Sequence, residues 1–360
     1  MKRAAIIAPV YPLNQTENED YINIPARLLS ELGLEVEILT LRQSGQPKKE
    51  VIEGFNVRRF ASPLSLFLYS IKKRPSLVHS NLRPYLPSLL AGLLPCKKVH
   101  TPMSDILGSN KIIKALSVSL YKRYDKILAH TPYGKQLFLD NGFSKEKVEV
   151  LPLPVNLKFF SRPKSAKGMS MLKVKGKPFI VTCVANFRSI KGVHVLLKAF
   201  SLFRKKAKKT KLVLVGKDFL GEEGKPTIRQ TAEELKIGKD VIHLGFLHGH
   251  DIKAVLDLSD VFCMASSVDA QCISIYEAGA DSIPLCLSDL PAFTSVFKSA
   301  ALYHKVGDAE GLARDLLTYY KNPKLRKANG AKAMKYAAVA DYNAVHKKLK
   351  ELYRSLLEKA

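Results

Sequence analysis

Short apolar runs alternate with amphipathic helical stretches along this chain, and the alternation runs through the sequence twice. In the first half a helical pattern over residues 24–32 ends at Gly33. The strand-like runs of this half are residues 4–9, 36–39, 76–79 and 126–129. Such a β-α-β-α order predicts a parallel sheet, because each helix returns the chain to the edge where the next strand starts.

The pattern stops between residues 151 and 177, where Pro, Gly, Ser and Lys dominate as in an interdomain connection. It then restarts. The second half has strand-like runs at 179–184, 211–215, 241–244 and 261–264, and helical patterns at 193–203, 227–235 and 251–258. Residues 308–360 are helical and mostly polar. We therefore expect an α/β chain of two doubly wound domains, with ligands bound between them. A length of 360 residues suits two such domains.

Charge and cysteine content narrow the class of protein. The net charge of +26 favours polyanionic partners such as nucleic acid, acidic lipids or phosphorylated substrates, although Lys-rich surfaces also occur in hyperthermophiles. The five cysteines form no C-x-x-C pair, which indicates neither a disulfide framework nor a zinc site and fits a reducing cytoplasm. No apolar run approaches the length that spans a bilayer. The start MKRAAIIAPVYPL favours a first strand over a signal peptide, because Pro9 and Pro12 interrupt it.

Residues 259–288 contain the pattern with the clearest chemistry. An apolar run, 261–264, leads into a small-polar loop with Asp269, and Glu277 follows as a helical stretch opens before the next apolar run. The N-terminus of a helix at the carboxyl end of a strand suits a phosphate group. Ionised carboxylates accept hydrogen bonds from hydroxyl groups. The segment therefore predicts a site for a sugar joined to a nucleoside diphosphate.

Two cations precede a predicted helix in the segment ANFRSIKGVHVLLKAF. Arg188 and Lys191 stand where helix-dipole electrostatics disfavour positive charge, unless an anion lies between them. The alternative is a solvated basic loop in a Lys-rich chain. Neither G-x-G-x-x-G nor G-x-x-x-x-G-K-[ST] occurs, which counts against a dinucleotide oxidoreductase and a P-loop nucleotidase.

An ordered series of segments carries a family resemblance. The series ANFRSIKGVHVLLKAF, KLVLVGK, VIHLGFL and DLSDVFCMASSVDAQCISIYEAGADSIPL resembles the donor domain of a GT-B retaining glycosyltransferase of family 4, the glycosyl transferases group 1. The resemblance covers nearly the whole chain and implies two Rossmann-like domains facing a central cleft. The implied parts are an acceptor-side domain over 1–165, a nucleotide-sugar donor domain over 166–337 and a C-terminal helix over 338–360 that crosses back to the first domain.

The resemblance also implies residue roles. Arg188 and Lys191 hold the donor diphosphate, Asp269 contacts the transferred sugar and Glu277 binds the ribose hydroxyls. The remaining donor contacts that it implies are Asn186, Gly216, Lys217, Leu244, Gly245, Phe246, Ile273, Ser274 and Ile275. No metal and no cofactor is expected beyond the donor, which is expected to be UDP- or GDP-linked.

This sequence departs from the family pattern at several positions. Asp269 replaces a Glu, and Ala270 and Cys272 stand where glycines usually let the backbone approach the phosphates. Met103 occupies the place of the family's His, so His100 is the candidate that remains for that catalytic role.

These departures leave an alternative open, a degenerate GT-B protein that binds nucleotide sugar or a partner without turnover. A nucleic-acid-binding protein is a third interpretation. Only the charge supports it, because no reading motif or aromatic platform is recognisable, and no nucleic-acid partner is expected.

The predicted reaction is retaining transfer of a sugar from a nucleotide sugar to a hydroxyl of a lipid-linked or polysaccharide acceptor. Basic amphipathic segments at 110–128 and 68–76 are typical of binding to an anionic membrane surface. The alternative is a helix packed on its own domain with a solvated Lys face. We expect a cytoplasmic protein, with peripheral binding at the inner face of the membrane if these basic segments share a face.

Overall fold

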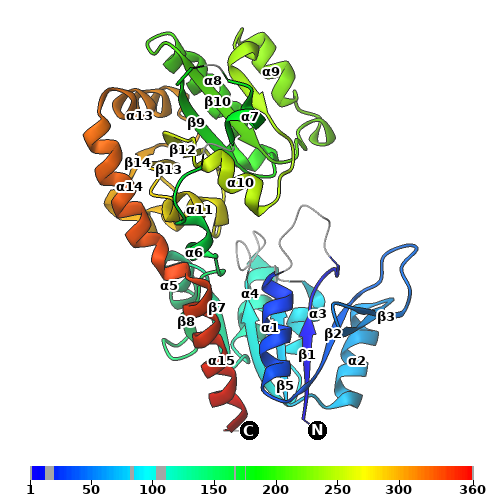
Figure 1. The fold of residues 1–360 in the computed structure, drawn as a ribbon. Coiled ribbons are helices and arrows are strands. Elements are labelled where there is room, and N and C mark those ends of the chain that lie inside the picture. The colour runs from blue at the N-terminus through cyan, green and yellow to red at the C-terminus, as the bar shows by residue number, and fades with distance from the viewer. Residues whose placement is uncertain are drawn as a thin grey trace. The chain divides into compact units, whose positions relative to one another are not determined.

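The computed structural model describes residues 2–12, 20–81, 85–102, 111–165, 168–174 and 176–358. The chain divides into two compact units (Figure 1). The first unit comprises Met1–Pro154 together with Asn343–Ala360, and the second comprises Val155–Tyr342. The division thus falls after Pro154, whereas the sequence prediction placed it after residue 165. Each unit is an α/β body built on its own sheet, as the repeated strand–helix alternation predicts.

The first unit contains an eight-stranded sheet in the order β3-β4-β2-β1-β5-β6-β7-β8. Its strands are β1 (Arg3–Ile7), β2 (Glu35–Leu41), β3 (Lys49–Ile52), β4 (Phe55–Phe60), β5 (Leu77–Asn81), β6 (Lys97–Thr101), β7 (Lys126–Ala129) and β8 (Val148–Val150). All neighbouring strands are parallel except the hairpin of β3 and β4. The expectation of a parallel sheet is therefore correct except at this edge.

Helices cover both faces of the first sheet. The helices are α1 (Asp20–Glu31), α2 (Pro63–Lys73), α3 (Leu86–Ala91), α4 (Lys111–Tyr121), α5 (Pro132–Asp140) and α15 (Tyr342–Glu358). Side chains from α2, α3, α4 and α5 share one hydrophobic cluster with Val78 of β5. The next residue, His79, bonds the hydroxyl of Tyr353 in α15. Because successive strand residues point to opposite faces, α15 lies on the other face of the sheet.

The second unit contains a six-stranded, all-parallel sheet in the order β11-β10-β9-β12-β13-β14. Its strands are β9 (Phe179–Val184), β10 (Thr210–Val215), β11 (Val241–His243), β12 (Val261–Met264), β13 (Leu285–Ser288) and β14 (Ala301–His304). β9 and β12 coincide with the predicted runs, and all four residues of β12 are buried. A strand buried on both faces reads as a continuous apolar run.

The helices of the second unit lie between these strands and at its C-terminal end. They are α6 (Leu157–Phe160), α7 (Gly168–Leu172), α8 (Val193–Arg204), α9 (Ile228–Glu234), α10 (Gly249–Leu256), α11 (Ile273–Ala280), α12 (Pro291–Phe297), α13 (Ala309–Lys321) and α14 (Pro323–Ala337). The two short helices α6 and α7 lie within residues 151–177, which the sequence analysis assigned to an interdomain connection. No helix in the described part of the chain is both long and apolar enough to cross a membrane.

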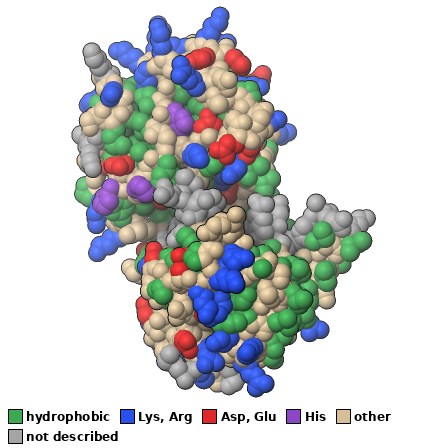
Figure 2. Space-filling view, turned by 90° about the vertical axis from the view of Figure 1, so that its right-hand side faces the viewer, with side chains coloured by type: hydrophobic (Ala, Val, Ile, Leu, Met, Phe, Trp, Pro, Cys, Tyr) green, Lys and Arg blue, Asp and Glu red, His purple; other side chains and the backbone are tan. Residues whose placement is uncertain are grey.

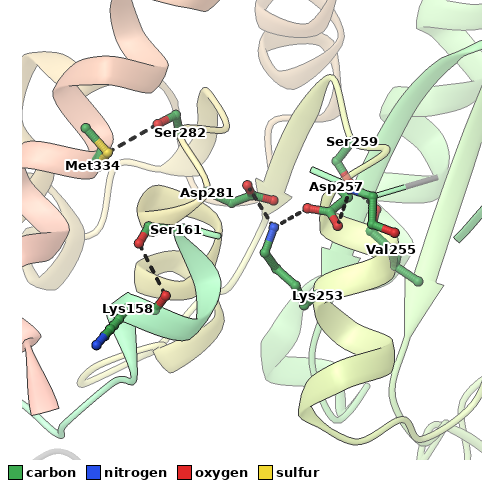
Figure 3. Close-up of polar contacts among 10 residues, drawn as sticks. Lys158, Ser161, Lys253, Val255, Asp257, Ser259, Asp281, Ser282 and Met334 are labelled. Carbon is green, nitrogen blue, oxygen red and sulfur yellow. Dashed lines mark hydrogen bonds and ion pairs between the residues drawn. The ribbon is translucent and has the colours of Figure 1, made fainter. Parts of the chain in front are cut away.

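A buried charge cluster joins α10 to the end of α11 (Figure 3). The ammonium group of Lys253 contacts the carboxylates of Asp257 and Asp281, and all three side chains are at most 8% exposed. Asp257 also accepts a hydrogen bond from the backbone N–H of Ser165, at 3.0 Å. Buried charges require such pairing, since each alone would lose its hydration without replacement. The cluster therefore fixes α10 against the C-terminal end of α11.

The strand order of the second sheet decides where a ligand can bind. From β9 the chain proceeds to β10 and β11 on one side and then returns to place β12 on the other side of β9. The loops that leave the carboxyl ends of β9 and β12 therefore diverge at a topological switch point. Open α/β sheets bind ligands at this position. The loop after β9 contains residues 185–192, and the loop after β12 contains residues 265–272.

Candidate functional site

The loops after β9 and β12 pack directly against each other. The backbone N–H of Ser267 donates to the carbonyl of Ile190 at 2.8 Å. Gly192 has a φ of +64°, and a Cβ there would lie 1.9 Å from the carbonyl oxygen of Ala265. Only glycine allows both this backbone conformation and this approach. Gly192 therefore brings the basic segment 188–191 beside the acidic loop 265–272.

Lys191 and Asp269, 78 residues apart in the sequence, form an ion pair in this loop pair. Lys191 Nζ donates to Asp269 Oδ2 at 2.7 Å, and the hydroxyl of Ser266 donates to the same oxygen at 3.3 Å. The Asp269 side chain is 7% exposed. Burial acts to lower the pKa of Lys191, but Cys272 and the Asp269 carboxylate outweigh it and raise that pKa above its ordinary value. The lysine therefore stays protonated and supplies a fixed positive charge.

Arg188 lies in the same segment with a different set of partners. Its guanidinium stacks on the ring of Phe219 at 4.3 Å and pairs with Glu223 at 3.4 Å. Glu223 also accepts hydrogen bonds from the N–H and the hydroxyl of Ser189. About half of the Arg188 side chain is exposed, so its remaining N–H groups can still reach an anion.

Helix α11 begins beside Lys191 and Asp269. Its N-cap residue, Cys272, makes no side-chain capping bond. Burial and the neighbouring Asp269 carboxylate raise the pKa of the Cys272 thiol to about 11, which keeps it neutral. The hydroxyl of Ser274 donates to the carbonyl of Val184, the last residue of β9, at 2.7 Å. The first turn of α11, including Ile273 and Ile275, is thus fixed at the carboxyl end of β9, where a helix N-terminus favours negative charge.

Glu277 lies one turn further along α11. Its side chain is partly buried, and burial raises the pKa of its carboxyl group to about 7. Within the described ranges, its carboxylate has no hydrogen-bonding or ion-pair partner in the protein. A carboxyl group that loses hydration without gaining a partner is destabilised in its charged form. Such an acceptor is suited to ligand hydroxyl groups.

Two glycines join the ends of β10 and β11 on the same side of the sheet. Gly216 donates its N–H to the carbonyl of Gly245 at 2.7 Å, and its own carbonyl bonds the His243 ring at 2.8 Å. A Cβ at Gly216 would lie 1.8 Å from the carbonyl of Ala185, so this position also requires glycine. Phe246 follows this junction and is 40% exposed, with its ring 5.0 Å from that of His248.

The other predicted donor-binding residues lie at the same strand ends. Leu244 follows β11 and packs in a core cluster with Val215. The carbonyl of Asn186 accepts a hydrogen bond from the N–H of Arg188 at 2.9 Å. The ammonium group of Lys217 lies 4.6 Å from the Phe219 ring and 3.6 Å from the Glu222 carboxylate. Ala270 belongs to the loop after β12.

His100 does not lie in this cluster, because it belongs to β6 of the first unit. Its ring is fully buried, stacks on Tyr121 at 4.3 Å and bonds the hydroxyl of Ser80 at 2.8 Å. Burial, with a smaller effect of His79, lowers the pKa of His100 to about 3. A neutral ring without exposed surface cannot contact a substrate, so the expected catalytic role has no support in this structure. Met103 lies outside the described residues.

The sequence analysis did not identify Glu223, Phe219 and Ser266 as site residues. Glu223 and Phe219 lie 35 and 31 residues after Arg188, in a polar stretch without periodicity, and no local pattern relates them to that residue. Ser266 is one of several small polar residues in its loop. Among the side chains that the structure describes, no group of three or more His, Cys, Asp or Glu forms a metal-binding cluster.

Comparison with known proteins identifies the family. The family described as "Glycosyl transferases group 1" matches residues 169–336, and "Glycosyltransferase Family 4" matches residues 22–159. The alpha-monoglucosyldiacylglycerol synthase of Acholeplasma laidlawii is 23% identical over 341 residues, which cover 89% of this chain and 80% of that protein.

Solved structures share the complete fold. Sucrose-phosphate synthase from Thermosynechococcus elongatus superposes with a TM-score of 0.80 at 19% identity, over 100% of both chains. Anabaena HepE in complex with UDP and glucose superposes with a TM-score of 0.78 at 15% identity, over 98% of this chain and 100% of that one. The two family matches together span most of the sequence, and both units have the matching parallel-sheet architecture. The chain therefore belongs to the family 4 glycosyltransferases with the GT-B fold.

Proposed function

We propose that this glycosyltransferase moves a sugar from a nucleotide-sugar donor to a hydroxyl group of a lipid-linked or polysaccharide acceptor. The transfer retains the anomeric configuration and requires no metal ion. The observation that carries the proposal is the arrangement at the switch point of the second sheet. There, the ion pair of Lys191 and Asp269 joins the two loops, and the bond from Ser274 to Val184 fixes the first turn of α11 at the end of β9.

The donor diphosphate is the group that fits this arrangement best. As the bond to the sugar breaks, negative charge grows on the departing diphosphate, and fixed positive charges stabilise it. Lys191 supplies one such charge, and Arg188 offers a second at a half-exposed position. The N–H groups of Ile273 and Ser274, at the start of α11, supply the positive end of a helix dipole. These groups replace the stabilisation that a metal ion gives in other transferases.

The two carboxylates serve the hydroxyl groups on either side of the diphosphate. Glu277, without a partner in the described chain, accepts the ribose hydroxyls, and Asp269 faces the transferred sugar. When the diphosphate binds, the ion pair between Lys191 and Asp269 must weaken or break so that Lys191 can contact the phosphate oxygens. The leaving phosphate takes the acceptor's proton, as the family resemblance implies, so no histidine is needed for that step.

Two relatives support the choice of substrates. The crystallised complexes of Anabaena HepE contain UDP or UDP-glucose, which favours a UDP-linked donor here, with GDP as the second choice. The Acholeplasma relative is by its name a synthase of a glucosylated diacylglycerol, which favours a lipid acceptor. A protein that works on such an acceptor is expected at the cytoplasmic face of a membrane.

The first experiment is a thermal-shift panel of UDP-, GDP-, ADP- and dTDP-sugars, because a ligand of the native state raises the melting temperature. The donor that binds is then supplied with lipid and polysaccharide acceptors, and transfer is measured with and without EDTA. Lys191→Ala and Glu277→Ala are each expected to reduce transfer by about a hundredfold or more, as loss of a group that stabilises the transition state does. EDTA is expected to have no effect.

Matched controls separate the site from the general charge of the protein. Lys198→Ala and Glu234→Ala remove one exposed charge of each sign from the same unit and are expected to keep full activity. Near-complete activity of both site variants would refute the assignment. Tight donor binding without transfer or hydrolysis on any acceptor would instead favour the second candidate, a binding protein without turnover. The replacements at Asp269, Ala270 and Cys272 motivate that candidate.

A further inference from the structure

Three consecutive helices of the first unit expose apolar side chains on their outer surface. In α2, Leu64, Leu68 and Ile71 are 42% to 59% exposed and follow the spacing i, i+4, i+7 of a single helix face. The opposite side of α2 is already buried, with Leu66 in the core. This helix therefore has a second apolar face that the unit itself does not cover.

The next two helices repeat the arrangement. Leu86 at the start of α3 and Leu93 just after its end are exposed, while Leu89 between them is buried. Ile113 and Leu116 of α4 are also exposed. We call these seven side chains the outer apolar face: Leu64, Leu68, Ile71, Leu86, Leu93, Ile113 and Leu116.

The three helices form one continuous surface. α3 packs against α2 on one side and against α4 on the other. The contact with α4 is close, because a Cβ on Gly92 would lie 2.7 Å from the carbonyl oxygen of Leu120. The hydroxyl of Ser88 in α3 also lies 2.9 Å from that of Tyr121 in α4. Neighbouring helices thus place their exposed apolar residues on the same side of the unit.

Exposed basic residues lie on two of these helices and directly after them. Residues 54–124 contain one acidic residue, Asp105, and twelve basic ones. Six of these basic residues are exposed at described positions of α2 and α4 or directly after them: Lys72, Lys73, Arg74, Lys114, Lys122 and Arg123. The sequences of α2, α3 and α4 contain no Asp or Glu. Figure 2 shows hydrophobic side chains gathered beside a run of Lys and Arg on the first unit.

We propose that the outer apolar face and its basic border bind the surface of an anionic lipid bilayer. Aliphatic side chains gain free energy when they enter the boundary between headgroups and acyl chains, and Lys or Arg attract anionic headgroups. Long basic side chains such as Lys72 and Lys114 can keep their charge among the headgroups while their stems lie against hydrocarbon. This inference does not depend on the identity of the donor.

The chemistry of the face favours a lipid surface over a protein partner. Binding energy at protein interfaces is concentrated in Trp, Tyr and Arg side chains that fill shaped pockets. The outer apolar face consists of Leu and Ile only. Three helices bearing aliphatic residues along one side, with cations around them, suit a fluid plane of lipid. The sequence analysis left two interpretations of segments 68–76 and 110–128 open, a membrane surface and helices packed on their own domain. The structure adds α3, which packs between α2 and α4.

Flotation of the purified full-length protein with lipid vesicles tests the proposal. Binding is expected to vesicles of equal parts phosphatidylcholine and phosphatidylglycerol, and much less to phosphatidylcholine alone. Binding is expected to weaken in 1 M salt, where the Debye length is about 3 Å. The variant Lys72→Glu, Lys114→Glu, Arg123→Glu is expected to bind roughly a hundredfold more weakly, because each basic residue near the surface contributes about a factor of five.

A second variant tests the apolar contribution. Leu64→Ser, Leu68→Ser, Ile71→Ser is expected to bind at least about tenfold more weakly, since partly buried aliphatic groups are lost. Leu68→Ser alone is used if the triple variant fails to fold, as judged by its melting curve.

Each variant has a matched control on exposed positions of the second unit. The charge control is Lys205→Glu, Lys206→Glu, Lys208→Glu, and the apolar control is Leu202→Ser, Val306→Ser, Val339→Ser. Both controls are expected to float like the wild type.

Three results would overturn the proposal. The first is no flotation of the wild type with anionic vesicles. The second is equal loss of binding in the variants and their controls, which would attribute binding to the total charge. The third is a wild-type dimer that the serine variant converts to a monomer without any change in flotation, because that result assigns the face to a second copy of the chain.

Discussion

The ionisation of Glu277 gives the most demanding test of the proposed donor site. Burial raises the pKa of this carboxyl group from 4.5 to about 7. If only the ionised form accepts the donor's ribose hydroxyls, the apparent dissociation constant is the intrinsic one divided by the ionised fraction. Affinity should therefore be nearly full at pH 8 and should fall by roughly tenfold at pH 6 and roughly thirtyfold at pH 5.5.

The ligand for this measurement must not titrate in the same range. A nucleotide sugar such as UDP-glucose meets this condition because its diphosphate is esterified at both ends. Free UDP does not, since the second pKa of a terminal phosphate is about 6. Isothermal titration calorimetry between pH 5.5 and pH 8 at constant ionic strength gives the dissociation constants. Glu277→Gln should bind weakly at every pH, and Glu234→Gln should behave like the wild type.

Glu277→Gln should weaken donor binding but increase the stability of the folded protein. The ionised carboxylate is disfavoured in the folded state, so its cost accumulates as the pH rises from 4.5 to about 7 and stays constant above. The difference between the two pKa values corresponds to about 3 kcal/mol as an upper limit. Glu277→Gln should therefore raise the melting temperature at pH 8 and leave it nearly unchanged at pH 4.5.

Two results would refute this reasoning. A wild-type affinity that does not change between pH 5.5 and pH 8 would show that the charge of Glu277 is irrelevant to binding. A decrease toward low pH that persists in Glu277→Gln would assign the titration to another group.

Three further predictions follow from neighbouring contacts. Gly192→Ala should lower the free energy of unfolding by at least about 2 kcal/mol and abolish donor binding, because the new Cβ would push the 188–191 segment away from Ala265. Normal donor binding by this variant would refute the requirement for close approach. Lys253→Ala should lower the free energy of unfolding by about 3–5 kcal/mol at pH 8, since two buried carboxylates lose their cation. The loss should be smaller at pH 5, because burial raises the pKa of Asp281 to about 6 and its carboxyl group takes up a proton there. Lys198→Ala should change the free energy of unfolding in urea by less than about 0.5 kcal/mol. Transfer should continue after exhaustive dialysis against EDTA, and its loss with recovery on adding Mg²⁺ would contradict the metal-free mechanism.

Local sequence patterns were sufficient to predict strands that are buried on both faces of the sheet. β9 and β12 read as continuous apolar runs because the sheet covers them on both faces, and their ends were predicted correctly. The hairpin of β3 and β4 was not predicted. In β3, exposed and partly buried residues alternate, and the two buried residues of β4 are Val57 and Arg59, so a charged side chain interrupts the apolar pattern. Edge strands of this kind obtain their pairing from neighbours rather than from their own composition.

Some features of the candidate site could likewise be predicted from the sequence, and others could not. Lys191 could be selected from the sequence because helix-dipole electrostatics disfavour a cation before a helix, and Asp269 because it lies between a strand and a helix in a segment that resembles the family. Their direct contact could not, since 78 residues separate them. His100 is a polar residue within β6, and the sequence alone cannot distinguish a reactive histidine from a buried one. In the structure its ring is fully buried and stacks on Tyr121, so it lies in the core.

The sequence by itself determined the twofold α/β alternation, the family and the residue types that a diphosphate and its sugar hydroxyls require. These features depend on side chains close together in the chain, whose periodicity and chemistry can be read directly. Only the tertiary structure decided that β12 returns to the side of β9, that Glu223 engages Arg188, and that α2, α3 and α4 expose a common apolar face. Such features depend on which distant segments pack together, and that is a property of the whole core rather than of any one segment.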